Sequence, residues 1–422
     1  MRRSILMKHP KMRYTYVGID SHKDNHTAVF LDCFFDKLGE IIFDNLPSKY
    51  DAFLKDAEKL RQDDTELLFG LEDTGSFGRT LTVYLTDTGQ QVRHVNSILV
   101  ARERKNQNIT QKTDSIDAEC AARVLLSKFG ELPAADPNDK YWILRTLVLR
   151  RDQTVTNNVR SKMILHDLLT QHYPNYRKFF VDTFRKTALA FFKKYPSPKN
   201  LEYVTIEELA DFFYAESNSV LGGENAWEKA KFILESLEDT TVEYQDIRDE
   251  AVRSVIRQIE FNLGEIERME LQMAIYLDKF DCTLTSMAGI DVVSACQMMS
   301  CIGDIRRFPT PAKLARYSGI APVTHASGKK DLQFANQRGK RELNSLFYML
   351  AVRLTSPTGP NYKIINPFFY EYFHRKQAEG KTKRQALKCV QRRLVNIIWT
   401  MLINNEEYVN PPVMDKPEDK AE

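Results

Sequence analysis

The segment KTDSIDAE, residues 112–119, places two carboxylates three positions apart, directly behind a lysine and a threonine. Two explanations fit this pattern. Acidic residues in the first turn of a helix stabilise the helix dipole, and Thr113 is a suitable N-cap. Residues i and i+3 also share one helix face, so Asp114 and Asp117 can both point toward one bound ion. The segment alone leaves a capped helix and a metal site open.

The residues in front of this segment predict the element order βββαβαβα. Strands are expected at 14–20, 26–34, 40–46, 66–72 and 91–96, and helices at 49–61, at 79–88 and after 96. The expectation follows from apolar alternation bounded by turn residues. Three hairpin-linked strands followed by α/β alternation is the order of the RNase H-like fold, in which the first and fourth strands lie side by side.

This order predicts where further carboxylates lie. Asp20 ends the first strand and Glu72 ends the fourth, so both are expected at one edge of the sheet. The last helix, which Asp114 and Asp117 open, packs beside the first strand in this fold. Four carboxylates can then converge on a hard divalent cation, Mg²⁺ or Mn²⁺, which prefers oxygen ligands and suits phosphate chemistry. In this context we interpret the two aspartates as metal ligands rather than caps.

Charge is distributed unevenly along the 422 residues, although the net charge is only +3. Residues 201–260 carry 15 acidic and 5 basic residues, whereas residues 301–400 carry 19 basic and 5 acidic ones. A block this basic favours a polyanionic partner, most often nucleic acid. The alternative is a solvated basic face that pairs with the acidic block.

The composition argues against several other classes of protein. No apolar run reaches the roughly 18 to 20 residues of a membrane span, and the basic start lacks the apolar core of a signal peptide. The six cysteines show neither CxxC pairs nor histidine spacing, so neither a disulfide framework nor a zinc site is expected. The cytoplasm is the expected location.

The middle of the chain is predicted to be helical. Residues 141–173 contain neither glycine nor proline, and a later run has apolar residues spaced by 4, 3, 4 and 3 positions, namely Val252, Ile256, Ile259, Leu263 and Ile266. A coiled-coil arm or antiparallel hairpin is one interpretation. An ordinary packed helix is the other, because few heptads are sustained.

The C-terminal part is expected to begin near Asp281. TSMAGIDVVSACQMM, residues 285–299, predicts a helix end, a tight turn at Gly289 and a new helix. This is similar to a helix-hairpin-helix, whose turn amides contact phosphates. A loop rich in glycine and lysine follows, with Ser327 in ASGKK. Serine before glycine is common in turns for conformational reasons, so Ser327 by itself is weak evidence for a nucleophile.

A series of motifs resembles those of the DEDD insertion-sequence transposases, the IS-one-ten family, which is related to the Piv-type DNA invertases. The motifs are GIDSHKDNHT, GLEDTG, KTDSIDAECAARVL, AGIDVVSA, IGDIRRF, LARYSGIAP, ASGKK and RGKREL. They occur in the family's order between residue 14 and about residue 355.

The resemblance implies an α/β domain followed by helical parts. These are an N-terminal RuvC-like domain at 14–135, a helical coiled-coil region at 136–280, a mostly helical C-terminal transposase domain at 281–405 and a flexible tail at 406–422. By motif, Asp20, Glu72, Asp114 and Asp117 are the metal-binding catalytic acids, and Ser327 is the nucleophile. A structured bridge RNA that pairs with target and donor DNA is also implied.

Two positions depart from the family's pattern. Asp291 stands at the second glycine of the hairpin turn, where its charge would repel a phosphate. Asn344 follows RGKREL where the family often has arginine, so Arg341 or Lys340 is expected to supply that basic contact.

These features predict a bridge-RNA-guided DNA recombinase. Ser327 would attack a scissile phosphate while Mg²⁺ held by the four acids neutralises the developing charge. Metal activation is favoured over His325 as the base. If acids and serine lie in different domains, the coiled coil would join them across a dimer or tetramer. The alternatives are a metal-dependent junction nuclease that uses water, and an inactive nucleic-acid-binding descendant, which the presence of all four acids disfavours.

Overall fold

The computed structural model describes residues 9–410, apart from 73–75, 136–139, 219, 239, 241, 328–329, 335, 337–338, 358 and 360–361. The chain divides into two compact units, Met1–Ile143 and Leu144–Glu422. The predicted boundary between residues 135 and 136 meets a segment outside the described residues. The predicted tail, 406–422, lies outside them beyond Asn410.

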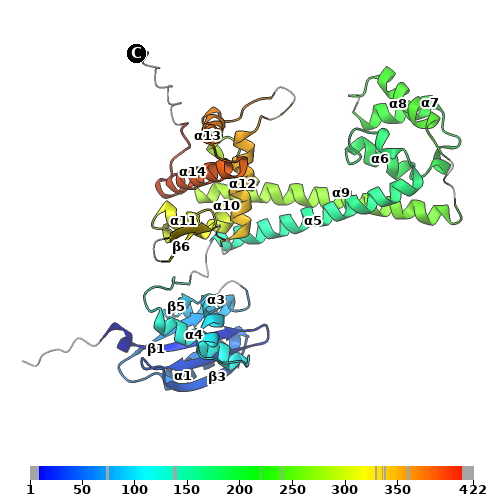
Figure 1. Cartoon of the computed structure of the whole chain (residues 1–422). Helices are drawn as coiled ribbons and strands as arrows, with labels where there is room; N and C mark the ends of the chain where they lie inside the picture. Colours follow the sequence, from blue (N-terminus) through cyan, green and yellow to red (C-terminus); the bar gives the residue numbers. More distant parts are fainter. Residues whose placement is uncertain are drawn as a thin grey trace, which may run out of the picture. The chain divides into compact units, whose positions relative to one another are not determined.

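A five-stranded mixed sheet forms the centre of the first unit (Figure 1). Its strands are β1 (Tyr14–Ser21), β2 (Asn25–Leu31), β3 (Lys37–Asp44), β4 (Glu66–Leu71) and β5 (Gln91–His94), in the spatial order β3-β2-β1-β4-β5. β1 pairs antiparallel with β2 and parallel with β4. The predicted element order and the adjacency of the first and fourth strands are confirmed. The arrangement is RNase H-like.

Helices cover both faces of this sheet. The helices of the unit are α1 (Pro47–Leu60), α2 (Arg79–Asp87), α3 (Ser97–Asn106) and α4 (Asp114–Ser127). Side chains alternate along β1, so Val17 and Ile19 pack with the α1 and α2 side, whereas Tyr16 packs with α3 and α4. Burial on both faces explains why β1 and β2 are apolar at most positions. The same alternation assigns Gly18 and Asp20 to the α4 face.

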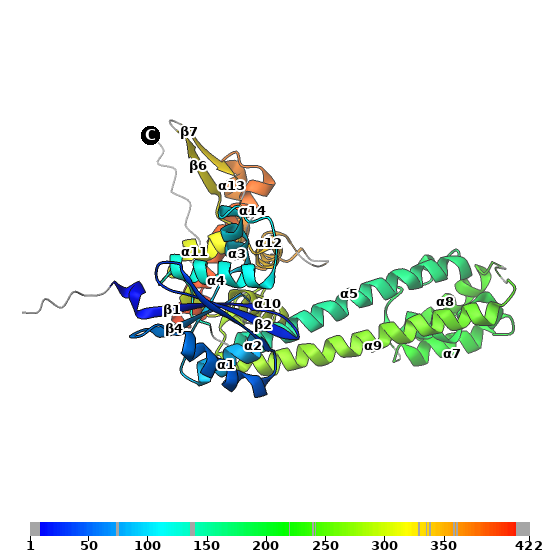
Figure 2. The same cartoon turned by 90° about the horizontal axis from the view of Figure 1, so that it is seen from below.

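Two long helices, α5 (Lys140–His172) and α9 (Gln245–Leu277), lie antiparallel alongside each other in the second unit (Figures 1 and 2). Near one end, Arg151 Nη2 lies 2.6 Å from Glu270 Oε1. Near the other end, Arg248 Nη2 donates to Gln171 Oε1 at 2.6 Å. Of the two interpretations of this region, the antiparallel hairpin is the one observed.

The apolar seam predicted along α9 ends earlier than expected. Its first three members are fully buried, in the core formed with α6 (Lys186–Lys194), α7 (Ile206–Glu216) and α8 (Gly223–Glu235). Leu263 instead is 40% exposed. The interior of the helix pair is polar at this level, because Asn158, Ser161 and Asn262 are buried there. A continuous apolar seam is therefore wrong beyond Ile259.

The remaining helices form the C-terminal part. They are α10 (Val292–Ile302), α11 (Pro311–Tyr317), α12 (Arg341–Thr355), α13 (Pro367–Ala378) and α14 (Lys383–Asn404), with the hairpin β6 (Val323–Ser327) and β7 (Lys330–Phe334). Short 3-10 turns lie at Pro10–Arg13, Tyr176–Lys178, Pro198–Leu201, Asp278–Phe280, Leu284–Ser286 and Ile305–Arg307. The segment around Ser327, expected as a loop, is therefore a β-hairpin.

The predicted helix-hairpin-helix differs from expectation on its first side. A single 3-10 turn, Leu284–Ser286, precedes Gly289, so two α-helices do not flank the turn. On the second side, the Asp291 side chain accepts a hydrogen bond from the Ser294 amide at 2.7 Å and caps α10. Arg353 Nη1 lies 3.6 Å from Asp291 Oδ2. Asp291 thus occupies the position at the helix N-terminus where a phosphate would bind.

All six cysteines are free thiols. None of the described helices is both long and apolar enough to cross a membrane.

Candidate active site

Close packing of α4 on β1 positions the predicted acids. A Cβ at Gly18 would lie 2.8 Å from Ala122 Cα, and nearer still to the Ala118 carbonyl oxygen and the Ala122 amide nitrogen. Only glycine permits this approach of helix to strand. Asp20 lies two residues further along the same strand face, and Asp114 begins the same helix. The contact at Gly18 therefore sets the distance between strand and helix carboxylates.

The first turn of α4 has both features that the sequence suggested. Thr113 Oγ1 accepts a hydrogen bond from the Ile116 amide at 3.3 Å, so Thr113 is the N-cap. Asp114 and Asp117 follow it in the first turn, where negative charge complements the helix dipole. The cap therefore starts the helix at the point that presents both carboxylates toward β1.

A three-residue group at this edge can hold a metal ion. One ligand atom each from Asp20, His22 and Asp114 lies within 4.8 Å of the others. His22 Nε2 is 3.1 Å from Asp20 Oδ2 and 3.2 Å from Asp114 Oδ1. Two carboxylates and an imidazole nitrogen suit Mn²⁺, and the oxygens alone suit Mg²⁺. The residues present therefore fit the predicted divalent cation.

Burial raises the pKa of Asp20, and the charges of Asp117 and Asp114 act in the same direction, whereas the hydrogen-bonded His22 opposes them. The influence of both helix aspartates on Asp20 shows that the three carboxylates share one electrostatic environment. Such crowding of acids is typical of sites that bind cations.

Asp117 is buried and already paired. Its Oδ1 accepts a short, charge-assisted hydrogen bond from Arg104 Nη1 on α3, and Lys112 Nζ lies 4.0 Å from its Oδ2. A cation at this edge would have to share Asp117 with Arg104. Asp117 therefore lies near Asp20, but it is not part of the group formed by Asp20, His22 and Asp114.

Glu72 follows β4 directly. The parallel register pairs Ile19 with Leu71, so Glu72 stands beside Asp20 at the end of the two strands. Gly70, two residues earlier, faces the α4 side chain of Leu125, and Glu72 continues that strand face. Residues 73–75 of the GLEDTG motif lie outside the described residues. The predicted edge location of Glu72 is therefore observed.

Sequence reasoning did not identify His22 and Arg104. His22 stands two positions after Asp20 within GIDSHKDNHT, and this spacing from a predicted ligand was the available signal. Arg104 is 13 residues from Asp117 on a different helix. No local pattern connects Arg104 with the acids.

Ser327 lies in the other compact unit. It is the last residue of β6 and is paired with Lys330 across the hairpin. Gly328 and Lys329 of the ASGKK motif fall outside the described residues. The four acids belong to Met1–Ile143 and the serine to Leu144–Glu422.

Comparison with known proteins agrees with these motifs. A family model described as "Transposase", for DEDD transposases of the IS110 type, matches residues 17–174. A second, described as "Transposase IS116/IS110/IS902 family", matches residues 282–363. The chain belongs to the IS110/IS116 family of DEDD transposases. The transposase is accordingly an enzyme that cleaves and transfers DNA strands.

The relatives of the transposase match nearly its full length. The insertion element IS116 44.8 kDa protein of Streptomyces clavuligerus is 25% identical over 94% of this chain and 96% of its own. The insertion element IS110 43.6 kDa protein of Streptomyces coelicolor is 23% identical over 93% and 95%. A pilin gene-inverting protein of Moraxella bovis is 21% identical over 94% and 98%.

Proposed function

We propose that this transposase is a bridge-RNA-guided recombinase of an insertion sequence, acting on DNA in the cytoplasm by serine transesterification. The observation that carries the proposal is the grouping of Asp20, His22 and Asp114 within 4.8 Å, at the edge where Glu72 and Asp117 also lie. We propose the same domain division that the sequence motifs predict. It consists of a RuvC-like domain at 14–135, a coiled-coil arm at 136–280, a transposase domain at 281–405 and a tail at 406–422.

Asp20, Glu72, Asp114 and Asp117, with His22 beside them, would hold Mg²⁺ or Mn²⁺. When bound, the ion supplies Lewis-acid stabilisation of a phosphate under attack. Asp20 and Asp114 lie close enough to share one ion, since His22 Nε2 contacts an oxygen of each. Asp117 contributes once its carboxylate is shared with, or released from, Arg104.

Ser327 is the proposed nucleophile. Its Oγ forms a bond to phosphorus while the bond from phosphorus to the 3′-oxygen breaks, and the serine proton ends on that oxygen. The DNA strand becomes joined to the protein through its 5′-phosphate. The free 3′-hydroxyl of another strand can reverse the step, so phosphodiester bonds are conserved without a high-energy cofactor.

A homo-oligomer would bring serine and acids together, because they belong to different compact units. The long helix pair offers a surface for this. Its exposed apolar side chains include Leu149, Val159, Met163 and Ile164 on α5, and Phe261, Leu271 and Ile275 on α9. Exposed apolar residues along a helix pair are typical of contacts with a second copy.

Binding of bridge RNA and DNA is supported by the surplus of 14 basic residues in 301–400. A junction nuclease is the second candidate. It is favoured by the fact that the acids are grouped within one unit independently of Ser327.

The decisive experiment seeks the covalent intermediate. With Mg²⁺, guide RNA and both DNA partners present, we expect a denaturant-resistant protein–DNA species that maps to a peptide containing Ser327. Ser327→Ala should lose the adduct and recombination while still binding nucleic acid, and Ser254→Ala, at an exposed position of α9, is the serine control. Cutting by Ser327→Ala at the parent rate, without an adduct in either protein, would establish the nuclease instead.

A further inference from the structure

The C-terminal part contains a groove whose described lining residues include none of the four acids and not Ser327. Two cavities of about 870 and 390 Å³ adjoin there and share Tyr348, Lys383 and Leu387 among their lining residues. Both volumes are within the range of ligand sites. We call the two cavities together the α12–α14 groove. The residues of α12 that line both cavities lie on one face of the helix, and residues of α14 line the opposite side.

One half of the groove is cationic. Arg341, Lys383, Arg384 and Lys388 line the larger cavity, and the described lining residues of both cavities include neither aspartate nor glutamate. Among the residues that the structure describes, none forms an ion pair with the exposed Arg341, Lys383 or Arg384. Uncompensated cations gathered around a cavity indicate an anionic ligand.

Two further features point to an anion at the same place. The helices α12 and α14 begin at Arg341 and Lys383, so the positive ends of both helix dipoles lie at this cavity. Burial, and then the charge of Arg384, lower the pKa of Lys388. This crowding of positive charge would be relieved by a bound phosphate.

The other half of the groove is aromatic. Tyr348 is 45% exposed and lines both cavities. Tyr370, Phe373 and His374 of α13 line the smaller cavity, with ring centroids 4.3 Å apart for Tyr370 and His374. Aromatic faces beside a cationic channel are the features with which proteins bind unpaired nucleotides, because bases stack on rings while phosphates meet lysine and arginine.

The groove adjoins the base of the β6–β7 hairpin, which carries Ser327 and is called the serine hairpin below. Lys340 N donates to Tyr317 O at 2.7 Å, and Asn344 Nδ2 donates to Ser318 O at 2.8 Å. Gly319 and Gly339 approach so closely there that a Cβ on Gly339 would overlap the Gly319 backbone. These contacts fasten the segments on either side of β6 and β7 to α12. Ser327 follows Val323 by four strand residues, about 14 Å along β6.

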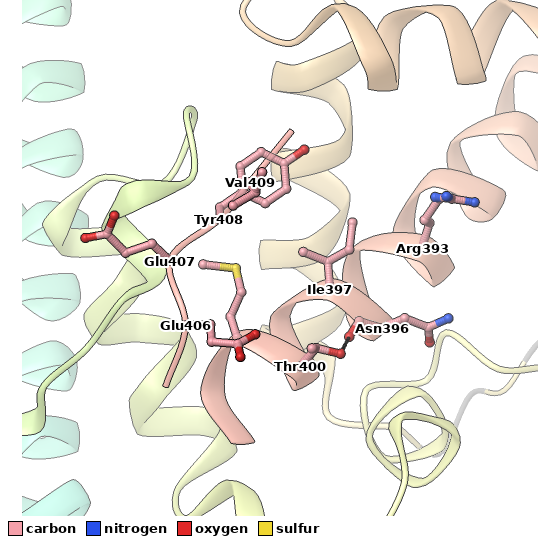
Figure 3. Close-up of a pocket in the computed structure, with 9 residues that line it drawn as sticks. Arg393, Asn396, Ile397, Thr400, Glu406, Glu407, Tyr408 and Val409 are labelled. Carbon is pink, nitrogen blue, oxygen red and sulfur yellow. Dashed lines mark hydrogen bonds between the residues drawn. The ribbon is translucent and has the colours of Figure 1, made fainter. Parts of the chain in front are cut away.

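A third cavity provides a contrast. It has a volume of about 500 Å³ and lies between α14 and residues 406–409 (Figure 3). Arg393 lines it from α14, with its guanidinium over the rings of Phe368 and Tyr372, whereas Glu406 and Glu407 line it from the segment that follows the helix (Figure 3). This mixed charge does not favour a phosphate, so Arg393 offers a control cation on the same helix as Arg384.

We propose that the α12–α14 groove holds an unpaired nucleotide of the DNA strand that is cut, with its phosphate at Arg341, Arg384 and Lys388 and its base against Tyr348. The choice of the DNA strand rests on the proposed function, because that strand passes the serine hairpin whose base forms one end of the groove. A paired base is stacked inside a duplex and cannot reach Tyr348. The groove therefore selects DNA that is locally unpaired near the cut.

Photo-crosslinking tests this directly in the full-length chain. The probe is single-stranded oligothymidylate with a single 5-iododeoxyuridine, used without Mg²⁺ on the Asp114→Ala protein so that no strand is cut. We expect crosslinks in the peptide 342–353, which contains Tyr348, or in α13. The duplex form and the RNA of the same sequence should crosslink there at least several-fold less. Because no catalysis is needed, failure of the serine mechanism would leave this result unchanged.

Matched variants separate base from phosphate contacts. Tyr348→Leu should weaken single-strand binding by about five- to 150-fold, the range for loss of one stacked base, while Tyr348→Phe should bind like the parent. Arg384→Gln should lower the slope of log affinity against log salt by about 0.7, whereas Arg393→Gln should leave that slope unchanged.

Three results would overturn the inference. They are crosslinks confined to other peptides, equal or stronger crosslinking at α12 and α13 by the duplex or the RNA, and equal binding by Tyr348→Leu and Tyr348→Phe.

Discussion

Gly18→Ala tests whether helix packing sets the geometry of the acids. The added Cβ would lie 2.8 Å from Ala122 Cα, whereas carbon atoms in contact rest about 3.5–4.0 Å apart. α4 must therefore move away from β1 by about 1 Å, and it would carry Asp114 and Asp117 with it. Forced overpacking of this kind costs about 1–3 kcal/mol. For a unit of this size that lowers the melting temperature by about 3–12 °C.

The effect on cleavage should exceed the effect on stability. A displacement of about 1 Å in a catalytic group can lower the rate by about 100-fold, so Gly18→Ala should be nearly inactive at temperatures where it is fully folded. Circular dichroism melting and Mg²⁺-dependent strand cleavage measure the two quantities. Gly264→Ala is the control, because a Cβ at this position in α9 would meet no atom within 4 Å. Removal of a helix-interior glycine should stabilise α9 by about 0.5–1 kcal/mol. Parent-like melting and cleavage by Gly18→Ala would refute the reasoning.

Three further predictions concern the acids and their neighbours. Asp20→Ala and Asp114→Ala should each abolish cleavage in Mg²⁺ without lowering the metal-free melting temperature, because removal of one clustered carboxylate relieves repulsion; cleavage at the parent rate by both would contradict the metal site. His22→Gln should weaken the binding of Mn²⁺ more than the binding of Mg²⁺, because imidazole is a better ligand for Mn²⁺. Calorimetry measures both affinities. Equal losses of affinity for the two ions would show that His22 only aligns the two carboxylates. Arg104→Gln should lower the free energy of unfolding of the metal-free protein by about 1–3 kcal/mol, since the buried Asp117 loses its charged partner. The variant should also bind Mn²⁺ more tightly, because Asp117 no longer has to leave an ion pair. Weaker Mn²⁺ binding would show instead that Arg104 orients Asp117 for the ion.

The sheet and its acids were predictable because local patterns determine them. Strand alternation predicted β1 to β5, and the RNase H-like order placed β1 beside β4, which the register of Ile19 with Leu71 confirms. The N-cap at Thr113 and the spacing of Asp114 and Asp117 likewise determined where α4 begins. Each of these features depends on residues that are neighbours in sequence or on a known strand order.

Features that depend on contacts between distant residues were not predictable. Leu263 continues the apolar spacing of α9, yet it is 40% exposed, and its neighbour Asn262 is the buried residue at that turn of the helix. Periodicity along one helix contains no information about the side chains of the helix that packs against it. The groove between α12 and α14 has the same origin, since Arg341 precedes the cations of α14 by 42 or more residues.

The ion pair between Arg104 and Asp117 changes the meaning of the cluster that the sequence predicted. Four carboxylates at one edge would repel one another in the metal-free chain, so some compensation is needed for the fold to form without a cation. Arg104 neutralises Asp117, and His22 lies between the oxygens of Asp20 and Asp114. Arg104 donates to an oxygen that a divalent cation would also contact, whereas His22 would give up its contacts with the two carboxylates to become a ligand itself. The metal-free edge is thus held in nearly its ligand-binding arrangement by side chains that a cation must partly displace, and the affinity for Mg²⁺ is reduced by the strength of the contacts that preserve the site.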